Sequence, residues 1–200
     1  MEFSGKKVTV VGTGISGIGA VGLLNAVGAE VVLYDGNEKL KIEDIEKKLG
    51  TYKAEIVLGE LTKELTDSSD LLVISPGVPI DSPVVKAFEA AGVPIWGEVE
   101  LAYAFDKGKV LAITGTNGKT TTTALVGQIV GAYHKDTFVV GNIGNPYTTE
   151  VLKSNKDSYT VAEISSFQLE TVHEFHPLVS AILNITPDHL NRHYTMDCYL

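Results

Sequence analysis

The sequence predicts an α/β protein, with a Rossmann-like parallel-sheet N-terminal domain followed by an incomplete P-loop-type α/β ATPase domain. Short β-branched segments alternate with segments of helical periodicity along the 200 residues, which is typical of a parallel sheet with crossover helices. Two of the predicted strands run into glycine-rich loops, and a predicted helix follows each loop at once. Backbone N–H groups in such loops and at such helix starts bind phosphate, so both loops are candidate nucleotide sites.

The Rossmann-like domain is expected within residues 1–97. The charged, amphipathic segment that ends at Gly50 is a predicted helix, with this glycine as its C-cap. The expected strands cover residues 7–12, 30–35, 54–59, 70–77 and 93–97, and the expected helices cover residues 16–27, 38–50 and 82–92.

A second domain is expected over residues 98–200. After the polar segment "DKGK" at residues 106–109, a new apolar strand begins, and the strand-then-helix rhythm repeats. The expected strands lie at residues 110–114, 137–142, 159–166 and 178–186. The last residues, "TMDCYL", are typical of a helix start and no closing strands follow, so the chain is expected to be the front part of a longer protein.

Composition excludes several classes of protein. The chain has 25 acidic and 16 basic residues, a net charge of -9, and no basic stripe, so no nucleic-acid partner is expected. A single cysteine, Cys198, excludes an internal disulfide and favours a cytoplasmic location. No apolar segment approaches the length of a membrane span, so no membrane insertion is expected. A monomer is expected.

The first glycine loop has the spacing G-x-G-x-x-G at Gly12, Gly14 and Gly17. Gly12 permits a tight turn, Gly14 lets phosphates approach the backbone, and Gly17 permits close helix packing. Asp35 ends the next strand, where an acid commonly accepts hydrogen bonds from sugar hydroxyls. This pattern leaves NAD and another diphosphate open as the ligand. A further loop, "SPGVP" at residues 75–79, follows another strand at the same edge of the sheet.

The second glycine loop, "ITGTNGKTT", ends as a phosphate-binding loop does, but Ile113 stands where the common G-x-x-x-x-G-K-[ST] pattern has its first glycine. Gly115 and Gly118 would let N–H groups face phosphate oxygens, and Lys119 would bridge the outer phosphates. Thr120 would place its hydroxyl on Mg²⁺. We interpret the loop as a variant and not as a damaged motif.

Two further polar residues follow predicted strands. Glu163 ends the strand "YTVAEIS", where a carboxylate would suit Mg²⁺, and an exposed strand-end charge is the alternative. His189 lies in "NITPDHLNRH", also after a strand. A neutral imidazole is an uncommon Mg²⁺ ligand, so the spacing alone does not assign a role to His189.

Taken together, "VVGTGISG", "SPGVP", "GTNGKTT", "AEISSFQLE" and "NITPDHLNRH" resemble the Mur ligases of peptidoglycan synthesis, in the same order along the chain. The phosphate loop of that family has the form G-T-N-G-K-T-T, which accounts for Ile113. The resemblance implies an ATP-dependent amide ligase that works through an acyl phosphate, with ATP and Mg²⁺ as cofactors. It also implies UDP-N-acetylmuramoyl-L-alanine and D-glutamate as substrates.

The resemblance implies a role for each matching position. Lys119, Glu163 and His189 would be catalytic, and Thr120, Glu163 and His189 would hold metal ions. The expected ATP-binding residues are Gly115, Thr116, Asn117, Gly118, Lys119, Thr120 and Thr121. The expected substrate-binding residues are Ile15, Ser16, Asp35, Gly77, Asn142, Ser165, Gln168 and His189. Residues 1–97 would then bind UDP and residues 98–200 would bind ATP.

The chain departs from the family pattern in two places. Gly36 and Asn37 follow Asp35, where some relatives have Thr and Arg, so a cationic contact there is not expected. The family's carbamylated lysine, its adenine-contacting residues and its amino-acid-binding C-terminal domain would all follow Leu200, so this chain alone is expected to bind the UDP-sugar without completing turnover. Two alternatives are a nicotinamide-dependent dehydrogenase, from the first loop alone, and a non-catalytic nucleotide-binding module.

Overall fold

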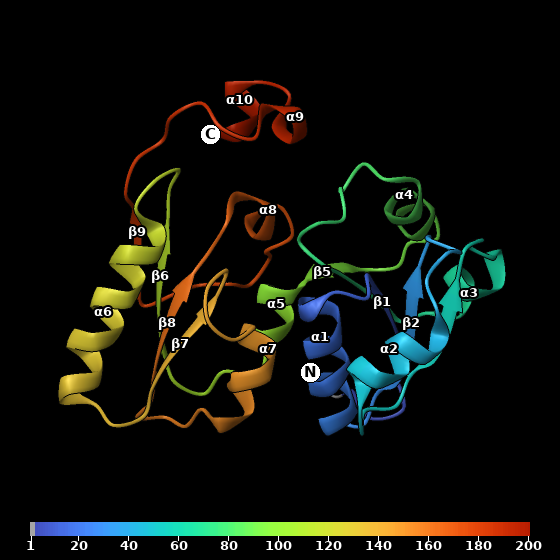
Figure 1. Ribbon diagram of the computed structural model, residues 1–200, viewed down its shortest axis with the longest axis horizontal. Coiled ribbons are helices and arrows are strands. Elements are labelled where there is room, and N and C mark those ends of the chain that lie inside the picture. Colours follow the sequence, from blue (N-terminus) through green and yellow to red (C-terminus); the bar gives the residue numbers. More distant parts are fainter. Residues whose placement is uncertain (1–2) are drawn as a thin grey trace.

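Two parallel sheets lie side by side in the computed structural model, which describes residues 3–200 (Figure 1). The α/β class predicted from the sequence is confirmed. The first sheet has the strand order β3-β2-β1-β4-β5 and the second has the order β7-β8-β6-β9. All strand pairs in both sheets are parallel. The carboxyl ends of the strands therefore share one edge in each sheet, where ligands bind in folds of this kind.

Strands of the first sheet are continuous apolar segments because both of their faces are buried. Val10 and Leu33 belong to the apolar cluster on one face, whereas Val11 and Val32 belong to the cluster on the other. The strands are β1 (Lys7–Val11), β2 (Glu30–Asp35), β3 (Glu55–Leu58), β4 (Leu71–Ile74) and β5 (Ile95–Gly97). The helices are α1 (Ile15–Ala26), α2 (Ile42–Leu49), α3 (Lys63–Ser68) and α4 (Pro83–Ala90).

The second sheet places the strand that leads into the phosphate loop between β8 and β9. Its strands are β6 (Lys109–Thr114), β7 (Thr137–Gly141), β8 (Tyr159–Glu163) and β9 (Val179–Ile182). Its helices are α5 (Glu98–Tyr103), α6 (Lys119–Tyr133), α7 (Tyr147–Glu150), η1 (Val151–Lys153), α8 (Ser166–Leu169), α9 (Leu190–His193) and α10 (Met196–Tyr199). The helix start expected from "TMDCYL" is confirmed by α10.

One apolar cluster runs from the first sheet into the second through α1, α5 and α7, which lie between the sheets (Figure 1). Beside this cluster, the segment "DKGK" is not only a link between two domains, because Asp106 within it forms several hydrogen bonds. The Asp106 carboxylate accepts hydrogen bonds from Tyr147 Oη at 2.6 Å, Thr160 Oγ1 at 2.8 Å and the Gly108 amide at 2.6 Å. The division between residues 97 and 98 stays a prediction.

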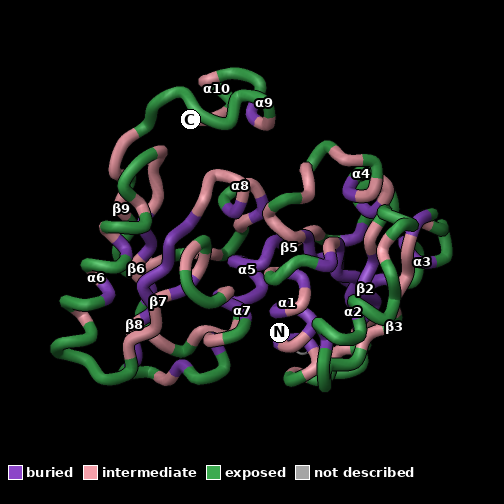
Figure 2. Tube along the Cα trace, viewed as in Figure 1, coloured by how far each residue is buried: buried purple, intermediate pink, exposed green. Residues whose placement is uncertain are grey.

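Burial is uneven along the chain. Figure 2 shows buried residues concentrated in the strands of both sheets, whereas the segment after β9 is mostly exposed or half-buried. Within the described residues, β9 is an edge strand; Val179 and Ile182 are exposed on it, and so is Leu178 directly before it. No helix between residues 3 and 200 is both long and apolar enough to cross a membrane.

Candidate functional site

The phosphate loop begins where the sheet ends, which explains why Ile113 can stand where the common pattern has its first glycine. Ile113 is buried and pairs with Glu163 of β8 and Ala181 of β9, so it is a core strand residue and not a loop residue. The tight part of the loop starts at Gly115, whose φ is +133°. A Cβ at this position would lie 3.0 Å from the Asn184 carbonyl oxygen, so both conformation and space require glycine.

Residues after β9 hold the loop in place. Asn184 pairs with Asn117 in both directions: the Asn117 amide donates to Asn184 Oδ1 at 2.9 Å, and Asn184 Nδ2 donates to the Asn117 carbonyl at 2.8 Å. The Thr186 amide donates to Thr116 Oγ1 at 2.9 Å, and Tyr199 Oη lies 2.9 Å from the same hydroxyl. Thr116 therefore has a structural partner on each side, and Asn184, Thr186 and Tyr199 are loop-supporting residues that the sequence motifs did not identify.

Lys119 starts α6 at the open end of the loop. Its ammonium group donates hydrogen bonds to the carbonyl oxygens of Gly115 at 2.7 Å and Thr116 at 3.1 Å. Gly118 is the N-cap residue, and the first turn of this 15-residue helix has no acidic side chain. Thr120 and Thr121 are exposed in the same turn. The helix terminus and Lys119 together give this loop a positive potential suited to phosphate.

Glu163 is almost completely buried, with 1% of its surface exposed, at the carboxyl end of β8. Its Oε1 accepts a hydrogen bond from Asn142 Nδ2 at 2.9 Å. Its Oε2 is buried and has no hydrogen-bond partner in the described chain. A buried carboxylate oxygen without a donor is costly, so this atom is suited to a cation or a donor from a ligand.

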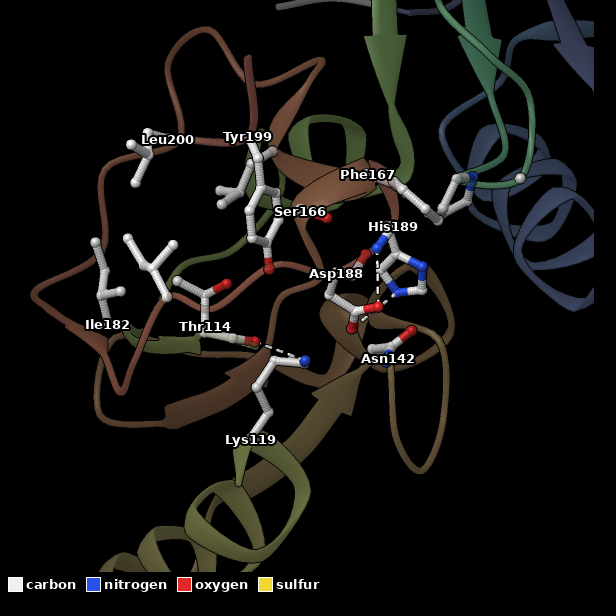
Figure 3. Close-up of a pocket in the computed structure, with 16 residues that line it drawn as sticks. Thr114, Lys119, Asn142, Ser166, Phe167, Ile182, Asp188, His189, Tyr199 and Leu200 are labelled. Carbon is white, nitrogen blue, oxygen red and sulfur yellow. Dashed lines mark hydrogen bonds and ion pairs between the residues drawn. The ribbon is translucent and has the colours of Figure 1, made fainter. Parts of the chain in front are cut away.

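A cavity of about 350 Å³ opens between the loops of the two sheets, and His189 and Lys119 both line it. Figure 3 shows the side chains of Lys119, Asn142, Asp188 and His189 directed toward one space. His189 has a left-handed backbone with φ of 52°, and its ring packs 4.9 Å from that of Phe167. Gly77 and Ser165 also line this cavity. Asp188 is a lining residue that the motifs did not single out.

Several expected site residues lie elsewhere. Thr120, Glu163 and Gln168 do not line the cavity, and Gln168 is occupied by the capping box of α8, in which it bonds with Ser165. Within residues 3–200, no three His, Cys, Asp or Glu side chains are grouped as a metal site. Thus Glu163 and His189 do not form a complete metal site by themselves.

The first glycine loop forms a separate groove of about 590 Å³, lined among others by Gly14, Ile15 and Lys48. A Cβ on Gly17 would lie 1.9 Å from the Gly12 carbonyl oxygen, so this helix start requires glycine. Asp35 Oδ2 accepts hydrogen bonds from the Thr13 amide at 3.3 Å and the Thr13 hydroxyl at 3.0 Å. In this structure, Asp35 supports the glycine turn.

Lys48 was missed in the sequence because it comes from α2. Its ammonium group donates to the Thr13 carbonyl oxygen at 3.4 Å, across 35 positions of sequence. Lys48 has no ion-pair partner among residues 3–200, whereas its neighbour Lys47 pairs with Asp44 at 3.3 Å. The first loop therefore has a free cation beside it.

A buried carboxyl group lies beneath the first loop. Glu98, 2% exposed at the start of α5, faces Ser16 of α1, the backbone of Tyr147 and Thr148, and Gln168. Burial raises the pKa of the Glu98 carboxyl, while the polar groups around it oppose the rise. Its Oε1 is buried and has no hydrogen-bond partner in the described chain. Glu98 had no role among the sequence predictions.

Family comparisons agree with this arrangement of two loops. Residues 6–97 match the family described as "Mur ligase MurD-like, N-terminal domain", and residues 113–200 match "Mur ligase middle domain". The chain belongs to the Mur ligase family. Neither match supports the dehydrogenase or the non-catalytic module.

Individual relatives match over the whole chain. A protein of Lachnospira eligens named "UDP-N-acetylmuramoylalanine--D-glutamate ligase" is 72% identical over 199 residues, which cover 100% of this chain and 44% of the relative. A relative of the same name from Lachnoclostridium phytofermentans is 60% identical over 201 residues, with the same coverage of 100% and 44%. The chain thus spans less than half the length of these curated relatives.

A solved structure shares the fold. It is the UDP-N-acetylmuramate:L-alanyl-gamma-D-glutamyl-meso-diaminopimelate ligase from Neisseria meningitides, with a TM-score of 0.60 and 18% identity. The match covers 98% of this chain and 65% of that one. At this identity the likeness concerns the fold alone.

Proposed function

We propose that this chain is the UDP-substrate-binding and ATP-binding part of an ATP-dependent amide ligase of peptidoglycan synthesis. The ligase adds D-glutamate to UDP-N-acetylmuramoyl-L-alanine. The observation that carries the proposal is the 72% identity to a ligase of that name over the full chain. The site geometry supports it, because one cavity is lined by the phosphate-loop Lys119, by Asn142 and His189, and by Gly77 of the first sheet.

ATP would bind at the second glycine loop. Within the expected ATP-binding residues 115–121, the amide groups of residues 118–121 at the start of α6 would face the phosphates, because the amides of Thr116 and Asn117 donate to Asn184. Lys119 would leave its carbonyl partners to contact the outer phosphates. Asn184 and Thr186 would keep the loop in shape while Lys119 moves. The protein's contribution to phosphoryl transfer is then mainly positioning and charge neutralisation.

The residues present fit Mg²⁺ in part. Thr120 would hold one ion through its hydroxyl, and Glu163 with His189 would contribute to holding a second. The unpartnered Oε2 of Glu163 is the observation that favours this assignment. Mg²⁺ would supply positive charge that lets one anion attack another. Because only two of these ligands belong to the second ion, further oxygen ligands, such as water or substrate oxygens, would complete its coordination.

The UDP part of the substrate would bind at the first glycine loop, beside Ile15, Ser16 and Asp35. Lys48 would add a cation there, in place of the one that Gly36 and Asn37 do not provide. The sugar and peptide would reach across the interface between the sheets toward Gly77, Asn142, Ser165 and His189. Gln168 would act through the cap that it forms with Ser165.

The reaction follows from these placements. The terminal carboxylate oxygen of the UDP-linked L-alanine would attack the γ-phosphorus of ATP, and the bond to the leaving ADP oxygen would break. The D-glutamate amine would then attack the acyl carbon, lose a proton and displace phosphate. A cytoplasmic location, a monomeric state and the division into residues 1–97 and 98–200 belong to the same proposal.

Phosphate release by the complete protein containing this chain tests the function. We expect release that requires ATP, UDP-N-acetylmuramoyl-L-alanine and D-glutamate together, with L-glutamate as the control amine. Binding of NADH with no response to the UDP compound would overturn the proposal. The 200-residue chain alone is expected to bind the UDP compound in a calorimetric titration without forming the amide, and product from this chain alone would contradict that expectation.

A further inference from the structure

A nearly buried ion pair joins segments that are far apart in the sequence. Arg192 Nη2 lies 2.5 Å from Glu170 Oε2, and Arg192 Nε lies 3.2 Å from Glu170 Oε1. Only 12% and 13% of the two side chains are exposed. The same Nη2 donates to the carbonyl oxygen of Val78 at 3.0 Å, a contact between residues 114 positions apart. One guanidinium group therefore connects α9, the end of α8, and the loop after β4.

Neighbouring groups support the same junction. The guanidinium carbon lies 4.9 Å from the ring centroid of Phe167. His193 Nε2 lies 2.9 Å from Ser166 Oγ, which ties α9 to α8 a second time. Tyr194 Oη donates to Asp81 Oδ2 at 2.6 Å, which adds a second bond between the segment after α9 and the first sheet's loop. The junction is thus made by several contacts and not by one side chain alone.

The arrangement uses properties that arginine has and lysine lacks. The planar guanidinium group engages both carboxylate oxygens and still has a donor for a backbone carbonyl, while its face packs on an aromatic ring. An ammonium group could neutralise the charge of Glu170. It could not at the same time bond to both carboxylate oxygens, donate to the Val78 carbonyl and pack a flat face on the Phe167 ring. Removing the cation alone would leave the nearly buried Glu170 charge with His193, whose Nδ1 lies 3.6 Å from Glu170 Oε1, in place of the guanidinium group.

Each segment held by Arg192 is a wall of the cavity. Val78 closes the turn that begins at Ser75 and contains Gly77, because the Val78 amide donates to the Ser75 carbonyl at 2.9 Å. Gly77 lines the cavity on the side of the first sheet, and Ser165 and His189 line it on the side of the second. The distance between these walls therefore depends on the junction at Arg192.

We propose that Arg192 is a positioning residue that fixes the loop at residues 75–81 against α8 and α9, and so sets the width of the cleft for the UDP-linked substrate. This inference rests on the proposed function. The contacts that hold the phosphate loop come from Asn184, Thr186 and Tyr199, none of which bonds to Arg192 in the described chain. Arg192 should therefore affect the UDP-linked substrate and leave ATP unaffected.

Steady-state kinetics of the complete protein tests the proposal. Arg192→Met should raise KM for UDP-N-acetylmuramoyl-L-alanine about tenfold or more, because small displacements of positioning groups weaken substrate contacts strongly. KM for ATP should stay within about twofold, since the phosphate loop keeps its own anchors. Arg192→Lys should recover only part of the loss. Lys153→Met, which breaks the Lys153–Glu150 pair of 2.7 Å outside the cleft, is the matched control and should change neither constant.

A second variant keeps the test decisive if the Glu170 charge without its guanidinium partner disrupts folding. Arg192→Met combined with Glu170→Gln removes both charges, and the same selective rise in KM is expected. An unchanged KM for the UDP-linked substrate in the folded double variant would overturn the proposal. An equal rise in both KM values would also overturn it, because it would indicate a general loss of structure.

Hydrogen exchange separates this proposal from the function on which it rests. In the folded double variant, the amides of Gly77, Val78, Ile80 and Asp81 should exchange faster than in the parent, whether or not the parent is a ligase. If the parent has no ligase activity but exchange rises at this loop, the function fails and the positioning role is supported. If exchange at the loop is unchanged, the positioning role fails.

Discussion

The two glycine loops are built from the same unit, a strand, a glycine turn and a helix, yet they are stabilised in different ways. The loop at residues 12–17 is held by its own backbone and by Asp35 of the adjacent strand. The loop at residues 115–118 is held by residues that follow β9, about 70 positions later in the chain. The first is a local structure, whereas the second depends on the segment that also carries His189.

The source of positive charge also differs between the loops. In the second loop Lys119 is part of the motif, and its ammonium group lies on the loop's own carbonyls. In the first loop no lysine is part of the motif, and Lys48 reaches the Thr13 carbonyl from α2. The difference teaches that similar loops in one chain can obtain a cation either from the motif or from tertiary packing.

Replacing Lys119 should give the largest effect, because its charge acts on the moving phosphoryl group. We expect Lys119→Ala to lower kcat by about 10³-fold. Lys109→Ala, at the start of the strand β6 that leads into this loop, should leave kcat near that of the parent, since the Lys109 side chain bonds with Tyr159 Oη and lies over the Tyr159 ring, away from the loop. Steady-state phosphate release from the complete protein measures both. Equal rates for the parent and Lys119→Ala would remove the second loop from the reaction.

Gly17→Ala should give the next largest effect, which is a loss of stability and not of kcat. Its Cβ would lie 1.9 Å from the Gly12 carbonyl oxygen, so the helix start must shift. We expect a loss of about 3 kcal/mol in the free energy of unfolding, measured by urea titration. Gly14→Ala is the matched control, because a Cβ there meets nothing within 4 Å. If both variants lose the same stability, close packing at Gly17 does not define this loop.

Lys48→Ala should reduce affinity for the UDP-linked substrate about tenfold, as expected for one lost charge-assisted contact to phosphate. Titration with UDP and with uridine locates the contact, because only UDP should respond if Lys48 binds phosphate. Lys47→Ala is the matched control, since Lys47 is paired with Asp44 and does not reach the loop. An unchanged affinity of Lys48→Ala for UDP would show that the backbone of the first loop binds phosphate without this cation.

Glu98→Gln should give the smallest effect, which is a change in how the free energy of unfolding depends on pH. Because burial raises the pKa of Glu98, the folded protein keeps a proton that the unfolded chain loses, and stability falls as pH rises from the unfolded pKa through the folded one. The variant should therefore be more stable than the parent at about pH 8, with a difference that shrinks toward about pH 4. Thermal unfolding at several pH values measures this.

Glu100→Gln is the control for the change at Glu98. Glu100 is also buried, but its carboxylate accepts hydrogen bonds from the amides of His173, Glu174 and Phe175. Its replacement should therefore destabilise the protein at neutral pH. A destabilising Glu98→Gln would mean that the Glu98 carboxylate is similarly well paired.

Much of the fold follows from local sequence patterns. The long apolar strands and the helices starting after the two glycine loops were predicted because burial on both faces and glycine spacing leave clear signals. The short helix α3 was not predicted, since its six residues are too few to show a helical period. The helix α8 was missed for the same reason, although Ser165 and Gln168 form a capping box that its sequence contains.

The residues of the candidate site that belong to a sequence motif were predictable. Those that reach the site only through tertiary packing were not. Residues 115–121 were identified by the loop pattern, and Glu163 by its place at the end of a strand. Asn184, Tyr199 and Lys48 left no signal, because an isolated polar residue gains its role only from the neighbour that it meets in the fold. The roles of Ile15, Ser16, Asp35 and Gly77 toward a substrate stay predictions.

By itself, the sequence determined the α/β class, the positions of both glycine loops and the family resemblance, because each depends on residues close together in the chain. Tertiary structure alone decided that Ile113 lies between β8 and β9, that Lys48 reaches the first loop, and that Arg192 joins α9 to Val78 across 114 positions. The physical reason is that distances between remote segments are set by how the two sheets pack around their shared core, which no local pattern records.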